Sequence, residues 1–270
     1  MSRWQTFAMV DWSGGNDRGA APKKDAIWAC VVRGAAAEQP VYLRNRQLAE
    51  DWLAGLVETE LTAGRRLFLG FDFPFGYPAG FARALTGKAD PLRLWNWFED
   101  RIEDSPGSNN RFDLAGEINR KFGGQGPFWA NGLKRGIDGL PRRKDRYRNP
   151  FPDRRAVEHL AKGSFTCWQM AGAGAVGSQV MMGLPVLSRL RRRFAGQVAA
   201  WPFEPLDAPV ALVEIWPSLT LGQPPAGMIK DAWQVQQAAL ELTRRPVAEL
   251  ERLLNIHAPE EGWILGVEPQ

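Results

Sequence analysis

Three carboxylates in this sequence stand where an isolated ionised acid would be unfavourable. Asp11 ends the short apolar run 6–11, where a Trp-Ser-Gly-Gly turn follows at once, and Asp72 ends a second apolar run in the same way. Glu214 lies inside the apolar run 208–220. A carboxylate buried in an apolar strand is stable only when it is paired or bound to a metal. These residues therefore predict a shared ion-binding site.

A fourth acid comes from a predicted helix at 230–245. Asp231 lies on the same helical face as Val235, Ala238 and Leu242, so it should turn toward the sheet with them. Each acid also has a simpler interpretation, because Asp could cap the turn after the first strand or the N-terminus of this helix. Together the four acids predict a site in which oxygen ligands bind Mg²⁺ or Mn²⁺.

Other kinds of catalytic site lack the necessary residues. The only thiol and imidazole ligands are Cys30, Cys167, His159 and His257, and no CxxC pair occurs. A zinc site of the Cys/His kind is therefore not expected. The scarcity of histidine also argues against Ser-His-Asp and Cys-His mechanisms, since neither histidine stands in a recognisable nucleophile motif.

Apolar periodicity predicts the elements that position the acids. Leu48, Trp52, Leu56 and Leu61 lie near helical spacing, and Gly64 stands where that helix should stop. In chain order we predict strands at 6–11, 26–32 and 40–44, a helix at 47–63, a strand at 65–72 and, after a long middle region, a strand at 208–220 and a helix at 230–245.

Positive charge is concentrated in one stretch. Residues 133–155 hold nine Lys or Arg against three Asp, a net charge of +6, whereas the whole chain carries +4. Such a stretch, broken by Pro and Gly, suits either a loop that contacts phosphates or a solvated surface insertion. A second basic run at 189–194 is expected on the exposed face of a helix. The candidate phosphate contacts are Lys134, Arg135, Arg142, Arg143, Lys144, Arg146 and Arg148.

The segment GAGAVG at 172–177 matches the glycine spacing of dinucleotide-binding turns. That function needs a strand before the turn and an acid about 20 residues after it, and neither is evident. A close-packing turn is the favoured interpretation, and a turn that offers backbone amides to a phosphate stays open.

No apolar run approaches the roughly 18 residues of a membrane span, and the N-terminus lacks the pattern of a signal peptide. We therefore expect a cytoplasmic protein with no membrane partner.

The segments VDWSGG, GFDFPFGYP and VEIWPSLT, with the Asp231 helix, resemble the ribonuclease-H-like fold. In particular they are similar to a family of predicted nucleases long named only as a domain of unknown function. Two further segments, GAVGSQVMMGLPVLSRLRRRF and the WPFE at 201–204, are similar to the same family. The resemblance implies an α/β fold in a single domain, 1–270. Its mixed sheet has three antiparallel strands followed by two parallel ones, with helices on both faces and a basic insertion at about 100–205 before the last strand.

This order of elements places the first and fourth strands side by side, with their carboxyl ends at one edge of the sheet. Open α/β sheets keep their sites at that edge, so Asp11 and Asp72 should meet. Crowded carboxylates should also raise one another's pKa values in the absence of metal.

The resemblance implies that Asp11, Asp72, Glu214 and Asp231 are the metal-binding and catalytic residues. The expected activity is phosphodiester hydrolysis assisted by Mg²⁺ or Mn²⁺, with Ser13 and Gly14 of the first turn and the cations of the insertion binding nucleic acid or another phosphate-bearing substrate.

Two alternatives remain open. One is a non-catalytic or phosphotransferase protein that binds a nucleotide or cofactor through the turn after Asp11. Some similar proteins carry a label that connects them to molybdopterin guanine dinucleotide synthesis. The other is an interaction protein whose acids are vestigial.

Overall fold

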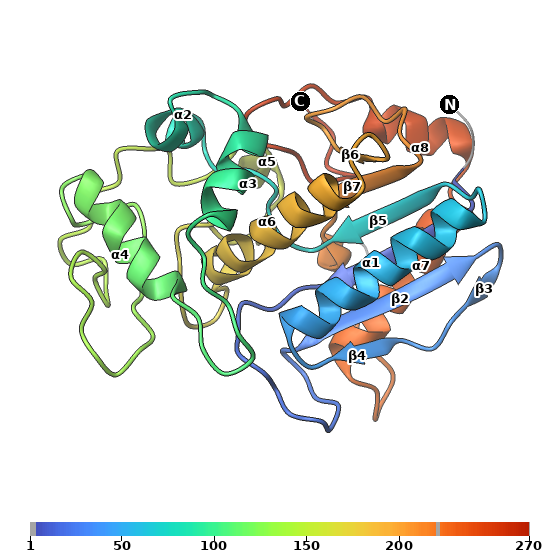
Figure 1. The fold of residues 1–270 in the computed structure, drawn as a ribbon, viewed down its shortest axis with the longest axis horizontal. Coiled ribbons are helices and arrows are strands. Elements are labelled where there is room, and N and C mark those ends of the chain that lie inside the picture. Colours follow the sequence, from blue (N-terminus) through green and yellow to red (C-terminus); the bar gives the residue numbers. More distant parts are fainter. Residues whose placement is uncertain (1–3, 220–221, 270) are drawn as a thin grey trace.

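The computed structural model describes residues 4–219 and 222–269, and its centre is one mixed β-sheet (Figure 1). The strand order is β3-β2-β1-β5-β7-β6, and β4 pairs with β2. Strand β2 runs antiparallel to β1, β3 and β4, whereas β5, β7 and β6 run parallel to β1. The strands are β1 (Thr6–Asp11), β2 (Ile27–Arg33), β3 (Ala36–Ala37), β4 (Val41–Leu43), β5 (Leu67–Phe71), β6 (Val198–Ala200) and β7 (Val210–Glu214).

The predicted α/β class and the mixed sheet are confirmed, and two short strands are additional. Strands β3 and β6 contain only two and three residues, too few to give an apolar period in the sequence. The predicted strand at 208–220 is shorter than expected, because β7 ends at Glu214 and a 3₁₀ turn, η1, covers Pro217–Leu219. Thr220, the last residue of that prediction, lies outside the described residues.

Helices cover both faces of the sheet. Helix α1 (Arg46–Thr62) and helix α6 (Val176–Arg193) lie in front of the sheet in Figure 1, and helix α7 (Lys230–Arg244) lies behind β1 and β2. Two buried apolar clusters separate these layers. Val10 and Leu69 pack toward α1 and α6, whereas their neighbours Met9 and Phe68 pack toward α7, as the alternation of side chains in a strand requires.

Local sequence signals explain where α1 begins and ends. The side chain of Asn45 accepts a hydrogen bond from the backbone of Leu48, which is the usual N-cap interaction. Gly64 has a φ of +65°, so the chain leaves the helix in a left-handed conformation that glycine adopts without strain.

The long region between β5 and β7 contributes most of the remaining helices. They are α2 (Phe81–Thr86), α3 (Pro91–Glu99), α4 (Arg111–Lys121) and α5 (Ala156–Leu160), and α8 (Val247–Leu254) follows later in the chain. The basic run at 189–194 forms the end of α6, where Arg189, Arg191, Arg192 and Arg193 pair with acids, so the expected helix is confirmed. None of the helices within residues 4–219 and 222–269 has the length and apolar character of a membrane span.

Candidate functional site

The carboxylates of Asp11 and Asp72 meet at the carboxyl end of two parallel strands. The register of β1 and β5 pairs Val10 with Phe71, so the next residue of each chain lies at the same level. The Asp72 backbone N–H donates to the carbonyl of Val10 at 3.2 Å, and the Trp12 N–H donates to Asp72 Oδ1 at 2.6 Å. The predicted juxtaposition of the two acids is therefore present.

Burial and mutual repulsion keep a proton on this pair. Desolvation, followed by the charge and the hydrogen bond of Asp72, raises the pKa of Asp11 well above its usual value. Burial also raises the pKa of Asp72 to about 6, although hydrogen bonds from Asp11 and Trp12 oppose that rise. The raised pKa values and the hydrogen bond between the two side chains indicate that Asp11 is the member of the pair that holds a proton more readily and donates it to Asp72.

Asp231 approaches the pair from the helix behind the sheet. It lies in the first turn of α7, and its charge adds to the rise in the pKa of Asp11. Its own pKa is raised by burial, while a hydrogen bond from the backbone of Asp25 to Oδ2, at 2.7 Å, opposes the rise. The helical face predicted for Asp231 therefore carries it to the site.

Asp25 is an acid of the site that sequence reasoning missed. It precedes β2 in a loop, its φ of +55° is left-handed, and its charge also raises the pKa of Asp11. The acid lies in the sequence KKDA, where two lysines make it resemble an ordinary solvated loop residue. Only the antiparallel return of β2 beside β1 brings it to the acids.

Glu214 lies on the opposite face of the sheet from Asp11 and Asp72. The register pairs Glu214 with Phe71, one residue before Asp72. Because successive side chains in a strand alternate, this single step directs Glu214 away from the aspartates. The structure therefore brings Asp11, Asp72 and Asp231 together but holds Glu214 apart from them.

The carboxylate of Glu214 is already bound within the protein. Arg155 donates to its two oxygens at 2.6 and 2.8 Å, and the backbone of Phe75 donates to Oε2 at 2.9 Å. Glu158 accepts from Arg155 Nε at 2.8 Å. Burial by itself would lower the pKa of Arg155. The charges and hydrogen bonds of Glu214 and Glu158 outweigh that effect, so the pKa lies above its ordinary value. We call this fully buried group the Arg155 triad.

The acids and the triad line one cleft of about 840 Å³. Ser13 and Gly14, which the sequence predicts to bind substrate, also line it, and the long insertion supplies another wall. That wall includes Arg111, Phe112, Gly132, Leu133, Phe165 and residues 170–176. The volume falls within the roughly 300–1,000 Å³ of pockets that enclose small ligands.

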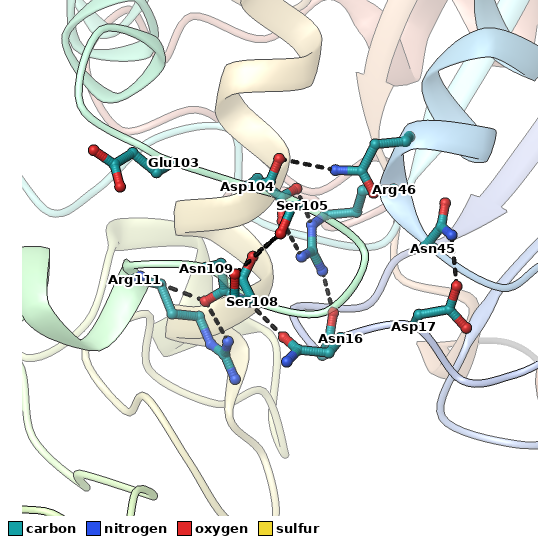
Figure 2. A network of polar contacts seen from close by, with 12 residues as sticks. Asn16, Asp17, Asn45, Arg46, Glu103, Asp104, Ser105, Ser108, Asn109 and Arg111 are labelled. Atoms are coloured by element: carbon teal, nitrogen blue, oxygen red, sulfur yellow. Dashed lines mark hydrogen bonds and ion pairs between the residues drawn. The ribbon is translucent and has the colours of Figure 1, made fainter.

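Polar contacts join the turn after Asp11 to the insertion (Figure 2). Arg46, the first residue of α1, donates to the carbonyls of Ser13 and Gly15 and forms a bidentate pair with Asp104. Asn16 accepts a hydrogen bond of 2.6 Å from Asn109. The turn is therefore held by residues far away in the sequence, and Arg46 was not identifiable as one of them.

Gly14 packs closely against the start of α6. A Cβ at Gly14 would lie 2.6–2.7 Å from the backbone and Cβ of Ser178 in α6. The side chain of Gln179 donates to the carbonyl of Trp12 at 2.7 Å and closes the same contact. The start of α6 therefore covers this turn.

The predicted cations of the insertion do not line the cleft, and several make contacts within the insertion. Arg142 donates to the carbonyls of residues 131, 134 and 135, and Arg135 pairs with Asp113 at 2.6 Å. Lys144 lies over the rings of Trp129 and Tyr147. The side chains of Lys134, Arg143, Arg146 and Arg148 are exposed.

The GAGAVG segment forms the turn that enters α6. Gly172 and Gly174 have φ values of +88° and +74°, and a Cβ at Gly177 would lie 2.6 Å from the carbonyl oxygen of Cys167. Among the described residues no strand of the sheet lies directly before this turn, because β5 ends at Phe71 and the next strand, β6, begins at Val198. These are the features of a close-packing turn.

We expect no useful affinity for NAD or FAD, because the turn lacks both the preceding strand and an acid for the ribose hydroxyls. Titration calorimetry with each dinucleotide checks this expectation. Saturable binding at micromolar concentration would contradict it.

The aspartates of the cleft have the carboxylate oxygens that Mg²⁺ and Mn²⁺ prefer as ligands, but they do not form a complete ligand shell. Asp11 and Asp72 supply hard oxygen ligands, and a cation between them would offset the repulsion that raises their pKa values. Over residues 4–219 and 222–269, no three His, Cys, Asp or Glu side chains form a group that could hold a metal ion. Comparison of the chain with protein-family models, curated proteins and solved structures finds no match.

Proposed function

We propose that this protein is a metal-dependent phosphodiester hydrolase of the nuclease type, built on a ribonuclease-H-like sheet. The observation that carries the proposal is the direct contact of Asp11 and Asp72 at the carboxyl edge of parallel strands, inside a cleft of about 840 Å³. Sites of open α/β sheets lie at this edge. Two touching carboxylates there repel one another unless a proton or a cation lies between them.

Asp11 and Asp72 would hold Mg²⁺ or Mn²⁺, and Asp231, whose charge acts on Asp11, would be an additional ligand. The ion would supply an activated water and would offset the charge that develops on the phosphate. The chain itself orients these ligands: the Trp12 N–H fixes Asp72, and the Asp25 N–H fixes Asp231.

Glu214 has a positioning role in this proposal instead of the ligand role that the family resemblance implies. Its Oε2 holds the backbone of Phe75 at 2.9 Å, and Phe75 belongs to the loop that leaves Asp72. The Arg155 triad thereby anchors the loop on which one of the acids depends.

The proposal is tested by incubating the protein with single- and double-stranded DNA and RNA, with Mn²⁺ or Mg²⁺ and with EDTA. We expect cleavage of at least one substrate with metal and none with EDTA. Asp51→Asn, which changes an exposed acid on α1, is the control and should retain the activity. Absence of cleavage together with absence of a metal-dependent shift in melting temperature would exclude the proposed function.

The exposed arginines of the insertion are expected to add non-specific affinity for polyanions. Replacing Arg143, Arg146 and Arg148 with Ala should weaken binding and flatten its dependence on salt, because each lost phosphate contact lowers the slope of log K against log salt by about 0.7–0.9. Fluorescence anisotropy over a salt series measures the slope. A slope equal to that of the unmodified protein would show that these residues contact no phosphate.

A further inference from the structure

The wall of the cleft contains an exposed aromatic ring. Phe165 is 53% exposed, the largest value for any large hydrophobic side chain among the described residues, and it lines the same cleft as the aspartates. Its ring lies on the backbone of Gly174, where a Cβ would come within 2.3–2.5 Å of the ring carbons. The glycine turn therefore supports the ring from one side, and the apolar core does not cover it.

The same wall carries an arginine that has no carboxylate partner. Arg111 Nε donates to Ser178 Oγ at 2.9 Å, Nη1 donates to Asn109 Oδ1 at 2.5 Å, and the guanidinium lies 4.4 Å from the centroid of the Phe112 ring. Among the described residues it forms no ion pair. Neutral groups thus hold a partly buried positive charge in a fixed place.

This charge is well suited to an anionic ligand. Burial, with the neighbouring charge of Arg46, lowers the pKa of Arg111 to about 10, so the side chain is still cationic at neutral pH. The charge of Asp104 partly opposes this shift, but Asp104 is paired with Arg46, so a phosphate entering the cleft would supply Arg111 with a direct anionic partner.

We propose that the cleft binds an unpaired segment of single-stranded nucleic acid, with Phe165 stacking on a base and Arg111 contacting a phosphate. The inference rests on the proposed function, for which it names the substrate class. Stacking on an aromatic side chain requires a free base face, which a continuous duplex does not offer. The cleft would therefore select single strands, frayed ends or loops over intact duplex.

The test is binding of a fluorescent oligothymidylate and of a duplex of equal length, measured by anisotropy in EDTA with the Asp11→Asn protein so that no strand is cut. We expect tighter binding of the single strand. Phe165→Ala should weaken that binding roughly tenfold, as loss of one stacked base does, and should leave duplex binding unchanged. Phe165→Trp should restore it. Leu48→Ala, at a similarly exposed position on α1, is the matched control and should have no effect.

Arg111→Gln should lower the salt slope for the single strand by about 0.7, the value of one phosphate contact. The proposal is overturned if the single strand does not bind, if Phe165→Ala binds it as tightly as the parent, or if dTMP competes as well as the oligonucleotide, which would indicate a free nucleotide ligand. Because binding is measured without metal, selective binding by a protein that shows neither cleavage nor a metal-dependent shift in melting temperature would refute the hydrolase and leave this inference standing.

Discussion

Asp11→Asn should abolish metal-dependent hydrolysis and, at pH 8, raise the melting temperature of the metal-free protein. Asp11 is buried against Asp72, and its pKa is raised by burial and by that neighbour. An asparagine retains a donor toward Asp72 and removes a carboxyl group whose ionised form is disfavoured by burial and by repulsion from Asp72. Mn²⁺ should raise the melting temperature of the unmodified protein and should have little effect on the variant, because a ligand stabilises only the state that binds it.

The gain in stability should depend on pH in a defined direction. Asp11 and Asp72 have folded-state pKa values above the usual 3.8, so between that value and about 6 the folded state binds more protons than the unfolded state. Stability of the metal-free protein therefore falls as the pH rises through this window, by up to about 1.4 kcal/mol per pH unit and group. Asp11→Asn should lose the part of this pH dependence of stability that comes from Asp11.

Differential scanning fluorimetry at pH 4.5 and pH 8, with EDTA or Mn²⁺, measures both effects. A difference of 1 kcal/mol corresponds to roughly 2–4 °C in a domain of this size. Asp51→Asn should follow the unmodified protein at each pH. If Asp11→Asn melts at the same temperature as the unmodified protein at pH 8 and keeps its response to Mn²⁺, Asp11 does not have the environment described here.

Arg155→Met should produce the largest loss of stability, about 3–5 kcal/mol, because it leaves Glu158 and Glu214 buried without a counter-charge. Arg155 also donates to the carbonyl of Glu261 at 3.0 Å, so the substitution removes one contact with the C-terminal segment as well. Urea denaturation measures the change in the free energy of unfolding.

Arg193→Met is the matched control. Arg193 pairs with Glu58, and both side chains are about half exposed, at 55% and 54%, so its loss should cost under about 1 kcal/mol. If Arg155→Met does not fold, the added changes Glu158→Gln and Glu214→Gln should restore a cooperative transition by removing the unpaired charges. Equal losses for Arg155→Met and Arg193→Met would contradict the role given to the Arg155 triad.

Local sequence pattern, together with the strand order of the ribonuclease-H-like resemblance, was sufficient to predict the meeting of Asp11 and Asp72. Each acid follows a short apolar run at once, and the order of elements makes the two strands parallel neighbours, so both carboxyl ends reach one edge. Helical periodicity was sufficient for Asp231, because its position relative to Val235 and Leu242 decides which face of α7 it occupies. These features depend on neighbours in the chain or on strand order alone.

Tertiary structure decided the place of Glu214 and of Asp25. A step of one residue in the register of β5 and β7 separates Glu214 from the aspartates, and nothing in a single strand specifies its register against another strand. Asp25 reaches the site through the return of β2 beside β1. Both outcomes depend on pairings between segments that are remote in the sequence.

The sequence by itself determined that positive charge gathers at 133–155, but the tertiary structure decided what each cation does. Arg155 belongs to this stretch, yet it is fully buried because Glu214, 59 residues away, reaches it across the sheet edge. Arg111 lies outside the stretch and faces the cleft, because Ser178 of α6 and Asn109 hold it there. The sequence shows how many charged residues a segment contains. Which of them are buried and which form ion pairs depends on contacts between distant segments, and these contacts exist only once the chain has folded.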